Sequence, residues 1–256
     1  MATAVGDPLP KDGRPLVTRN LPSRRGWIAV GCGGLTALVV LVILIRHEPG
    51  FYRQARVAGA GRDRRAEADA AESLSRRAMT KASAWYAALG REGPWEMVLT
   101  AAEVNAWLAV DLPRNHAMLL PRGVSDPRIA LGQRHFRGGA RVGLGPLTAV
   151  AWVDLEIVLK DVNRLVIAVD EVRLGAIPLP RAAVLRDLAG RLAALGAATE
   201  LLRLDGRPVL MVYIPSDQGG RFPGCRLEAL AVDADEILLS GETRGAGESS
   251  RPPDPS

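Results

Sequence analysis

The stretch LTAVAWVDLEIVLKDVNRLVIAV, residues 147–169, decides the predicted fold. Every second side chain in its first part is aliphatic, which is the period of a β-strand with one buried face. The segment DVNR at 161–164 predicts a turn, and the apolar alternation resumes after it. Two long strands that share one apolar face predict an antiparallel sheet with water on its other side. The buried face would hold Leu147, Ala149, Ala151, Val153, Leu155, Ile157, Leu159, Leu165, Ile167 and Val169.

The opposite face of these two strands carries the carboxylates of Asp154, Glu156 and Asp170. Paired acids can perform acid–base catalysis when burial separates their pKa values. Because this face is predicted to lie in water, we expect its carboxylates to be solvated or salt-bridged rather than to form a reaction centre.

The second strand runs into DEVRLGAIPLP, residues 170–180, which predicts a corner between a strand and a helix. Gly175 would let the chain bend or let another backbone approach closely. Pro178 would stop strand pairing, and Pro180 would occupy the first position of the next helix. The apolar stripe of that helix would run to Gly206 through Val184, Leu185, Leu188, Leu192, Leu195 and Leu202.

Upstream, VLTAAEVNAWL at 98–108 predicts a short amphipathic helix. Thr100 and Glu103 have the spacing of a capping box, in which each side chain accepts a hydrogen bond from the other residue's backbone N–H. Asn105 lies off the apolar face of this helix, and we expect its side chain to hydrogen-bond nearby backbone.

The remaining patterns complete a mixed fold. A long alanine-rich helix is predicted over 62–89 and would end at Gly90. The segment RGG at 137–139 predicts a hairpin turn, and short strands are predicted over 209–214 and on both sides of a turn at 233–235. This order predicts an α+β fold, in which helices pack on one face of a curved antiparallel sheet.

Residues 26–45, GWIAVGCGGLTALVVLVILI, are 20 consecutive residues without a charge. A helix of that length crosses the roughly 30 Å hydrocarbon core of a bilayer. Trp27 at one edge, and Phe51 and Tyr52 beyond the other, are typical of aromatic residues at a membrane interface. The run is too long for the apolar core of a cleaved signal peptide, and no small-residue cleavage site follows it directly. We therefore expect a single-pass signal anchor.

Basic residues flank the span on both sides in nearly equal number, but Arg24 and Arg25 abut it directly. We therefore expect a short cytoplasmic tail and a C-terminal domain outside the cytoplasm. The predicted organisation is a disordered basic tail at 1–25, the transmembrane helix at 26–45, a juxtamembrane linker and helical stalk at 46–95, the α+β extracytoplasmic domain at 96–244 and a disordered tail at 245–256.

The sequence contains no recognisable catalytic, metal or cofactor motif. Its three histidines are His47, His116 and His135, and no H-E-x-x-H, H-x-H, C-x-x-C, G-x-S-x-G or Walker A pattern occurs. We therefore expect no catalytic residue, no metal, no cofactor and no enzymatic activity. The net charge of +5 comes without a nucleic-acid-binding motif, so we expect no nucleic-acid partner. Cys32 lies in the span and Cys225 is expected to be a buried, unpaired thiol.

The segments VLTAAEVNAWL, LLPRGVSDPRIAL and EVRLGAIPLPRAAVL, within residues 98–190, follow an anchor in an order that resembles the bacterial YpmS-like membrane-anchored proteins and their planctomycete relatives. A wrapped sheet with a helix in its concavity is also similar to tubular lipid-binding and LmeA-type envelope domains. The resemblance implies a role in handling lipid in the envelope. It carries over no catalytic residue, because the shared motifs are caps and turns.

Two functions fit these observations. The domain either binds lipid or another apolar ligand, or it is a structural or assembly protein that binds another envelope protein. We expect the bilayer as a partner through residues 26–45, while the arginines between 62 and 77 either contact anionic headgroups or form a solvated helix face. The residues predicted to line an apolar ligand site, or to plug the mouth of the core, are Trp107, Leu108, Ile177, Leu179, Val184 and Leu188.

Overall fold

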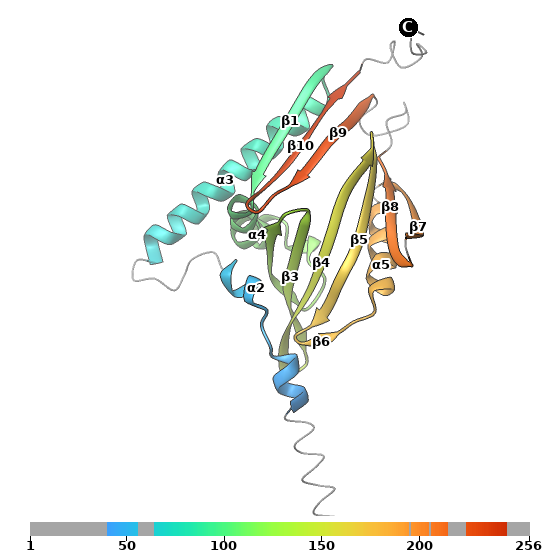
Figure 1. The fold of residues 1–256 in the computed structure, drawn as a ribbon. Helices are drawn as coiled ribbons and strands as arrows, with labels where there is room; N and C mark the ends of the chain where they lie inside the picture. Colours follow the sequence, from blue (N-terminus) through green and yellow to red (C-terminus); the bar gives the residue numbers. More distant parts are fainter. Residues whose placement is uncertain (1–39, 56–63, 195, 205, 215–223, 245–256) are drawn as a thin grey trace, which may run out of the picture. The chain divides into compact units, whose positions relative to one another are not determined.

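The computed structural model describes residues 40–55, 64–194, 196–204, 206–214 and 224–244 (Figure 1). Both predicted tails and residues 26–39 of the predicted span lie outside these ranges. The chain divides into two units, 1–41 and 42–256, and every labelled element belongs to the second. In chain order these elements are α2 (Gly50–Gln54), α3 (Arg64–Leu89), β1 (Gly93–Thr100), α4 (Ala101–Asn115), the 3₁₀ turn η1 (Ala117–Leu119), β2 (Val124–Gly132), β3 (His135–Leu144), β4 (Leu147–Asp161), β5 (Arg164–Leu174), β6 (Ile177–Pro178), α5 (Arg181–Ala194), β7 (Ala198–Leu204), β8 (Arg207–Tyr213), β9 (Cys225–Val232) and β10 (Glu236–Thr243).

The strands form two antiparallel sheets. One has three strands in the order β1-β10-β9, and the other has seven, in the order β2-β3-β4-β5-β8-β7 with β6 beside β5. The predicted α+β class and antiparallel pairing are confirmed. The sequence predicts one sheet because residues 98–100 resemble the start of a helix, whereas they form the end of β1 and pair with β10.

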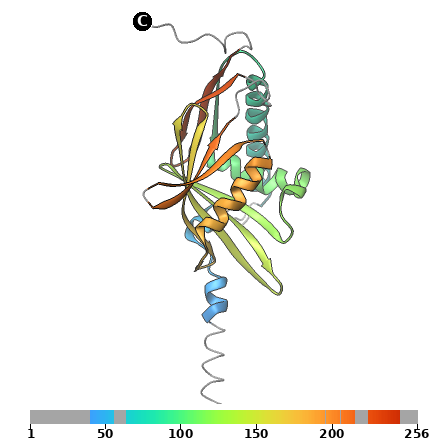
Figure 2. The same ribbon diagram turned by 90° about the vertical axis from the view of Figure 1, so that its right-hand side faces the viewer.

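The predicted hairpin of β4 and β5 forms, and it lies in the middle of the larger sheet. Its apolar positions face one another across the ladder, as in the pair Ile157–Ile167, and its turn falls at 162–163. α5 packs on this face (Figure 2) and buries Leu185 completely. Full burial of one such side chain contributes roughly 1.5–3 kcal/mol. The buried residues of this core are Ile167, Val169, Val172, Leu185, Leu210 and Val212.

On the opposite face of the same sheet, the short helix α2 packs over β3 and β4. A Cβ atom at Gly139 would lie 3.1 Å from the Tyr52 ring and 3.3 Å from Phe51. Phe51 packs edge-on against Trp152, with ring centroids 5.8 Å apart. Tyr52 is completely buried, so its predicted place at a membrane interface is wrong. Helices therefore lie on both faces of this sheet, not on one as the sequence predicts.

Two local predictions are wrong because strand pairing overrides local pattern. Residues 137–139 are not a turn but lie within β3, paired on both sides, and the turn before β3 contains Arg134 at φ 63°. The helix after Pro180 ends at Ala194 and not at Gly206, because Leu202 pairs with β8 as part of β7. Pro178 pairs with Arg173 as the last residue of the short β6, so strand pairing stops there, as predicted.

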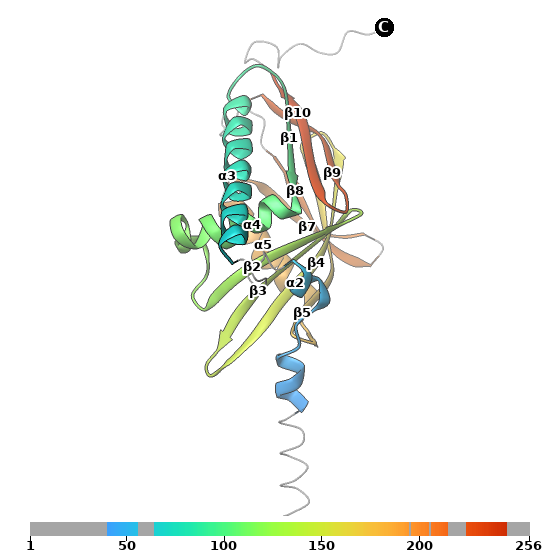
Figure 3. The same cartoon turned by 90° about the vertical axis from the view of Figure 1, so that its left-hand side faces the viewer.

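α3 packs against α4 and β1 (Figure 3). It ends at Leu89, as predicted, and its first half buries Ala71 and Ser75 in this contact. The helix that was predicted as a stalk is therefore docked on the domain near both of its ends. Cys225 is a free, buried thiol in the cluster next to this contact, as predicted.

The predicted capping box starts α4. The Glu103 amide donates to Thr100 Oγ1 at 3.1 Å, and the Thr100 amide donates to Glu103 Oε2 at 3.0 Å. Lys81 of α3 also donates to Glu103 Oε2, at 2.8 Å. One carboxylate thus caps α4 and ties it to α3.

The buried ring of Tyr52 makes stability depend on pH. Burial raises the pKa of Tyr52 to about 12, with a further contribution from Asp126 that Arg128 and Arg141 oppose. The folded protein therefore holds the phenol proton where an unfolded chain releases it, so this stability is complete below about pH 10 and is lost towards pH 12. We expect the free energy of unfolding to fall by roughly 2–3 kcal/mol over that interval. Denaturant titrations should show this fall in the natural chain and not in Tyr52→Phe; equal falls would contradict it.

Candidate functional site

An open apolar groove of about 440 Å³ lies on the α5 face of the seven-stranded sheet. Its floor crosses β2 to β5 along the row of paired residues Ile129, Gly138, Val153 and Val172. The floor is hollow because Gly138 has no side chain. Ala140 and Ala151, which pair with each other beside it, have short side chains. The lining residues are Leu108, Pro127, Arg128, Ile129, Gly138, Gly139, Ala140, Ala151, Trp152, Val153, Val172, Leu179 and Val184.

Two helices form the walls of the groove. Asn105 holds α4 on β2, because its side chain donates to the Ile129 carbonyl at 2.9 Å and accepts from the Ile129 amide at 2.8 Å. These two hydrogen bonds confirm the expected structural role of Asn105. They also place Leu108, one turn later in α4, in the lining of the groove. On the other side the Leu179 amide donates to the Val172 carbonyl at 2.8 Å, which places Leu179 at the start of the second wall.

The interior of the groove has almost no polar chemistry. Arg128 is the only ionisable residue among those that line it, and its guanidinium is engaged elsewhere. Its Nη1 donates to the Tyr52 carbonyl at 2.7 Å, its Nε donates to Asp126 at 3.1 Å, and its Cζ lies 4.2 Å from the centre of the Tyr52 ring. A polar ligand would find no partners in the groove and would lose its hydrogen bonds to water. The groove therefore suits an aliphatic ligand.

The six residues predicted for an apolar site are only partly brought together. Leu108, Leu179 and Val184 line the groove, and Leu188 packs with Val184 on the core beneath α5. Ile177 pairs with Leu174 in β6, outside the groove lining. Trp107 lies in a different pocket.

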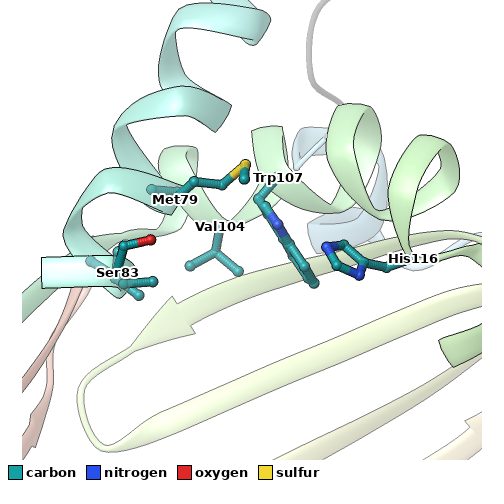
Figure 4. A pocket seen from close by; sticks show the side chains of 8 residues that line it. Met79, Ser83, Val104, Trp107 and His116 are labelled. Carbon is teal, nitrogen blue, oxygen red and sulfur yellow. The ribbon is translucent and has the colours of Figure 1, made fainter. Parts of the chain in front are cut away.

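That second pocket, of about 390 Å³, lies between α3 and α4 (Figure 4). His116 stands at one end beside Trp107, and its Nε2 lies 3.3 Å from the buried Asp111 carboxylate. Figure 4 shows Ser83 at the other end, with Val104 between them. Because His116 does not face this hydroxyl, the pocket lacks the contact that a serine–histidine nucleophile requires.

A polar cluster lies on the other face of the sheet. The Nδ1 atom of His135 is 3.2 Å from Asp154 Oδ1 and 3.5 Å from Asp170 Oδ2, and one ligating atom from each residue would fit around a cation. The second oxygen of Asp154 accepts from Arg137 at 2.8 Å, and that of Asp170 lies 3.7 Å from Arg207. Asp154 is only 8% exposed, so the prediction of a solvated face is wrong there, while the predicted salt bridging is present. The arrangement cross-links β3, β4, β5 and β8 through charged side chains.

The floor of the groove was missed in the sequence. Gly138 and Ala140 follow Arg137 in a run that resembles a turn, and Ile129 precedes it on a strand broken by Pro127. The available signal was the pair of small residues, Ala149 and Ala151, on the otherwise bulky apolar face of residues 147–159.

No family model, curated protein or solved structure matches the chain. Within the part of the chain that the structure describes, no helix is both long and apolar enough to cross a membrane.

Proposed function

We propose that this protein is a non-catalytic, membrane-anchored envelope protein that holds the acyl chain of a lipid in the groove between α4 and α5. The observation that carries the proposal is the groove itself, which is apolar throughout and open to the outside. Its volume of about 440 Å³ lies within the range of about 300–1,000 Å³ typical of ligand sites.

A membrane lipid is the favoured ligand because the groove lies close to the predicted anchor. Leu179 follows Ala176 by three residues, and the Ala176 amide donates to the carbonyl of Leu44 at 2.8 Å. Leu44 is the penultimate residue of the apolar run 26–45. A chain drawn from the bilayer therefore has a short path to the groove.

The chemistry of the groove favours binding over catalysis. A catalytic site needs a nucleophile, acid or base within reach of the ligand, whereas Arg128 is bound to Asp126 and to the Tyr52 carbonyl. The proposed orientation, with the domain outside the cytoplasm, follows from Arg24 and Arg25 at the other end of the span.

Photo-crosslinking tests this proposal. The full-length chain would be reconstituted in vesicles that contain a phospholipid with a diazirine midway along one acyl chain, then irradiated and digested. We expect adducts within residues 138–153 or 172–188, in addition to those in the span. Adducts confined to 26–45 would contradict the proposed site.

The second candidate function is assembly with another envelope protein. It is favoured by Met118 and Leu119, which are 92% and 63% exposed on η1, beside the pocket between α3 and α4. A photoreactive residue at Met118 that captures one reproducible protein in cells, together with a groove free of lipid adducts, would support this function over lipid binding.

A further inference from the structure

We infer that the end of the seven-stranded sheet formed by the β3–β4 turn and the β5–β6 corner rests on the bilayer surface, so that the groove takes its lipid directly from the adjacent leaflet. This inference rests on the proposed membrane anchor and lipid ligand. It adds the surface through which the lipid enters.

The corner at Gly175 is held against the chain where the predicted span ends. Gly175 has φ +61°, and a Cβ atom there would lie 2.3 Å from the Leu44 carbonyl oxygen and 2.4 Å from that of Ile45. The Trp152 indole N–H donates to the Gly175 carbonyl at 3.2 Å, which fixes the corner from the other side. A span that ends at Ile45 therefore brings this corner to the membrane interface.

The segment after Ile45 does not act as a free linker. Glu48 accepts from Arg141 of β3 at 2.7 Å. The Tyr52 hydroxyl donates to the Asp126 carbonyl of β2 at 2.5 Å. The Phe51 ring packs edge-on against Trp152 of β4. These contacts to β2, β3 and β4 hold residues 48–52 on the sheet.

The β3–β4 turn reaches beyond this corner. The Gly175 amide donates to the Val150 carbonyl at 2.7 Å, and the turn precedes Val150 by three residues, which is about 10 Å of strand. The tip of the turn is Leu144, Gly145 and Pro146, all exposed.

The chemistry of this end suits a bilayer interface with anionic lipids. Leu144 and Leu179 are each 38% exposed. Arg181 is exposed two residues after Leu179, and Arg46 is exposed directly after Ile45. Apolar side chains bury themselves about 5–10 Å deep at the boundary of headgroups and acyl chains, and arginines beside them are attracted to an anionic surface. The acids next to the corner, Glu48 and Glu171, are paired with Arg141 and Arg173.

The position of Leu179 then defines the entry to the groove. It is three residues from Ala176, a distance of at most about 11 Å along the chain. An acyl chain can therefore pass from the leaflet to the groove without a path through water.

Depth-dependent fluorescence quenching tests the contact independently of lipid binding in the groove. The full-length chain with Cys32→Ser would carry an NBD label at Leu144→Cys or Pro146→Cys, neither of which lines the groove, in vesicles of equal parts phosphatidylcholine and phosphatidylglycerol with spin-labelled lipid. The control is Ala234→Cys, in the exposed β9–β10 turn, where Val232 accepts from Arg134 at the far end of β3. We expect severalfold stronger quenching at both test positions than at the control.

Equal, weak quenching at all three positions would overturn the inference. If Leu144→Cys fails to fold, Pro146→Cys samples the same turn. Lipid adducts in the groove without quenching at the turn would leave the proposed function standing and remove this inference. Quenching without groove adducts would support the membrane contact, but it would contradict both lipid entry and the proposed function.

Discussion

Replacement of Gly175 by valine should lower the free energy of unfolding of the full-length protein by about 3 kcal/mol, through two separate costs. Gly175 has φ +61°, which a β-branched residue adopts only with strain. Its Cβ would also fall 2.3 Å from the Leu44 carbonyl oxygen, so the 42–48 segment would have to leave the corner. The measurement is thermal unfolding in detergent, where we expect a fall of roughly 6–12 °C.

Gly145→Val is the matched control for this change. Gly145 has nearly the same backbone conformation, φ +64°, but a Cβ there would meet nothing within 4 Å. Its replacement should cost only the backbone strain, about 1–2 kcal/mol. Equal melting temperatures for the two variants would show that close approach of the Leu44 backbone is not what requires glycine at the corner.

The second large effect is expected from Ala151→Phe, which should lower the yield of groove adducts with the photoreactive lipid about tenfold. This corresponds to a loss of about 1.4 kcal/mol in the binding free energy of the lipid. Ala151 pairs with Ala140, and both line the floor. A phenyl ring there would occupy the volume that the acyl chain needs. The groove is open, so the ring should enter it without displacing the core, and the melting temperature should change little.

Ala198→Phe controls for the added ring. Ala198 is exposed on the edge strand β7 and does not line the groove. Its adduct pattern should match that of the natural chain. A normal yield from a folded Ala151→Phe variant would show that the acyl chain lies elsewhere.

Local rules predicted the parts of the fold in which local and tertiary preferences agree. The alternation over 147–169 forms β4 and β5 because its aliphatic face meets α5. Thr100 and Glu103 form their capping box because both partners lie within one helical turn. Gly175 could be recognised as a close-approach position from its place between a strand and two prolines.

The rest depends on partners that are distant in sequence. Tyr52 is an interfacial aromatic by pattern, but Asp126 and Arg128, more than 70 residues away, bury it. Leu202 fits a helical stripe, yet the neighbouring β8 offers it a ladder position. Half of the predicted site could be found from the sequence: Leu108 from the amphipathic pattern at 98–108, and Leu179 and Val184 from the corner and the helix that follows it. The small residues of the floor could not, because their role appears only once β3 and β4 are paired.

Native mass spectrometry of the full-length chain, released from lipid-containing nanodiscs, tests the central claim most directly. We predict a species that retains one phospholipid under activation sufficient to strip the lipids around the span. That species should be strongly reduced in Ala151→Phe and unchanged in Ala198→Phe. A chain that appears only at its lipid-free mass under those conditions would contradict the claim that the groove holds a lipid.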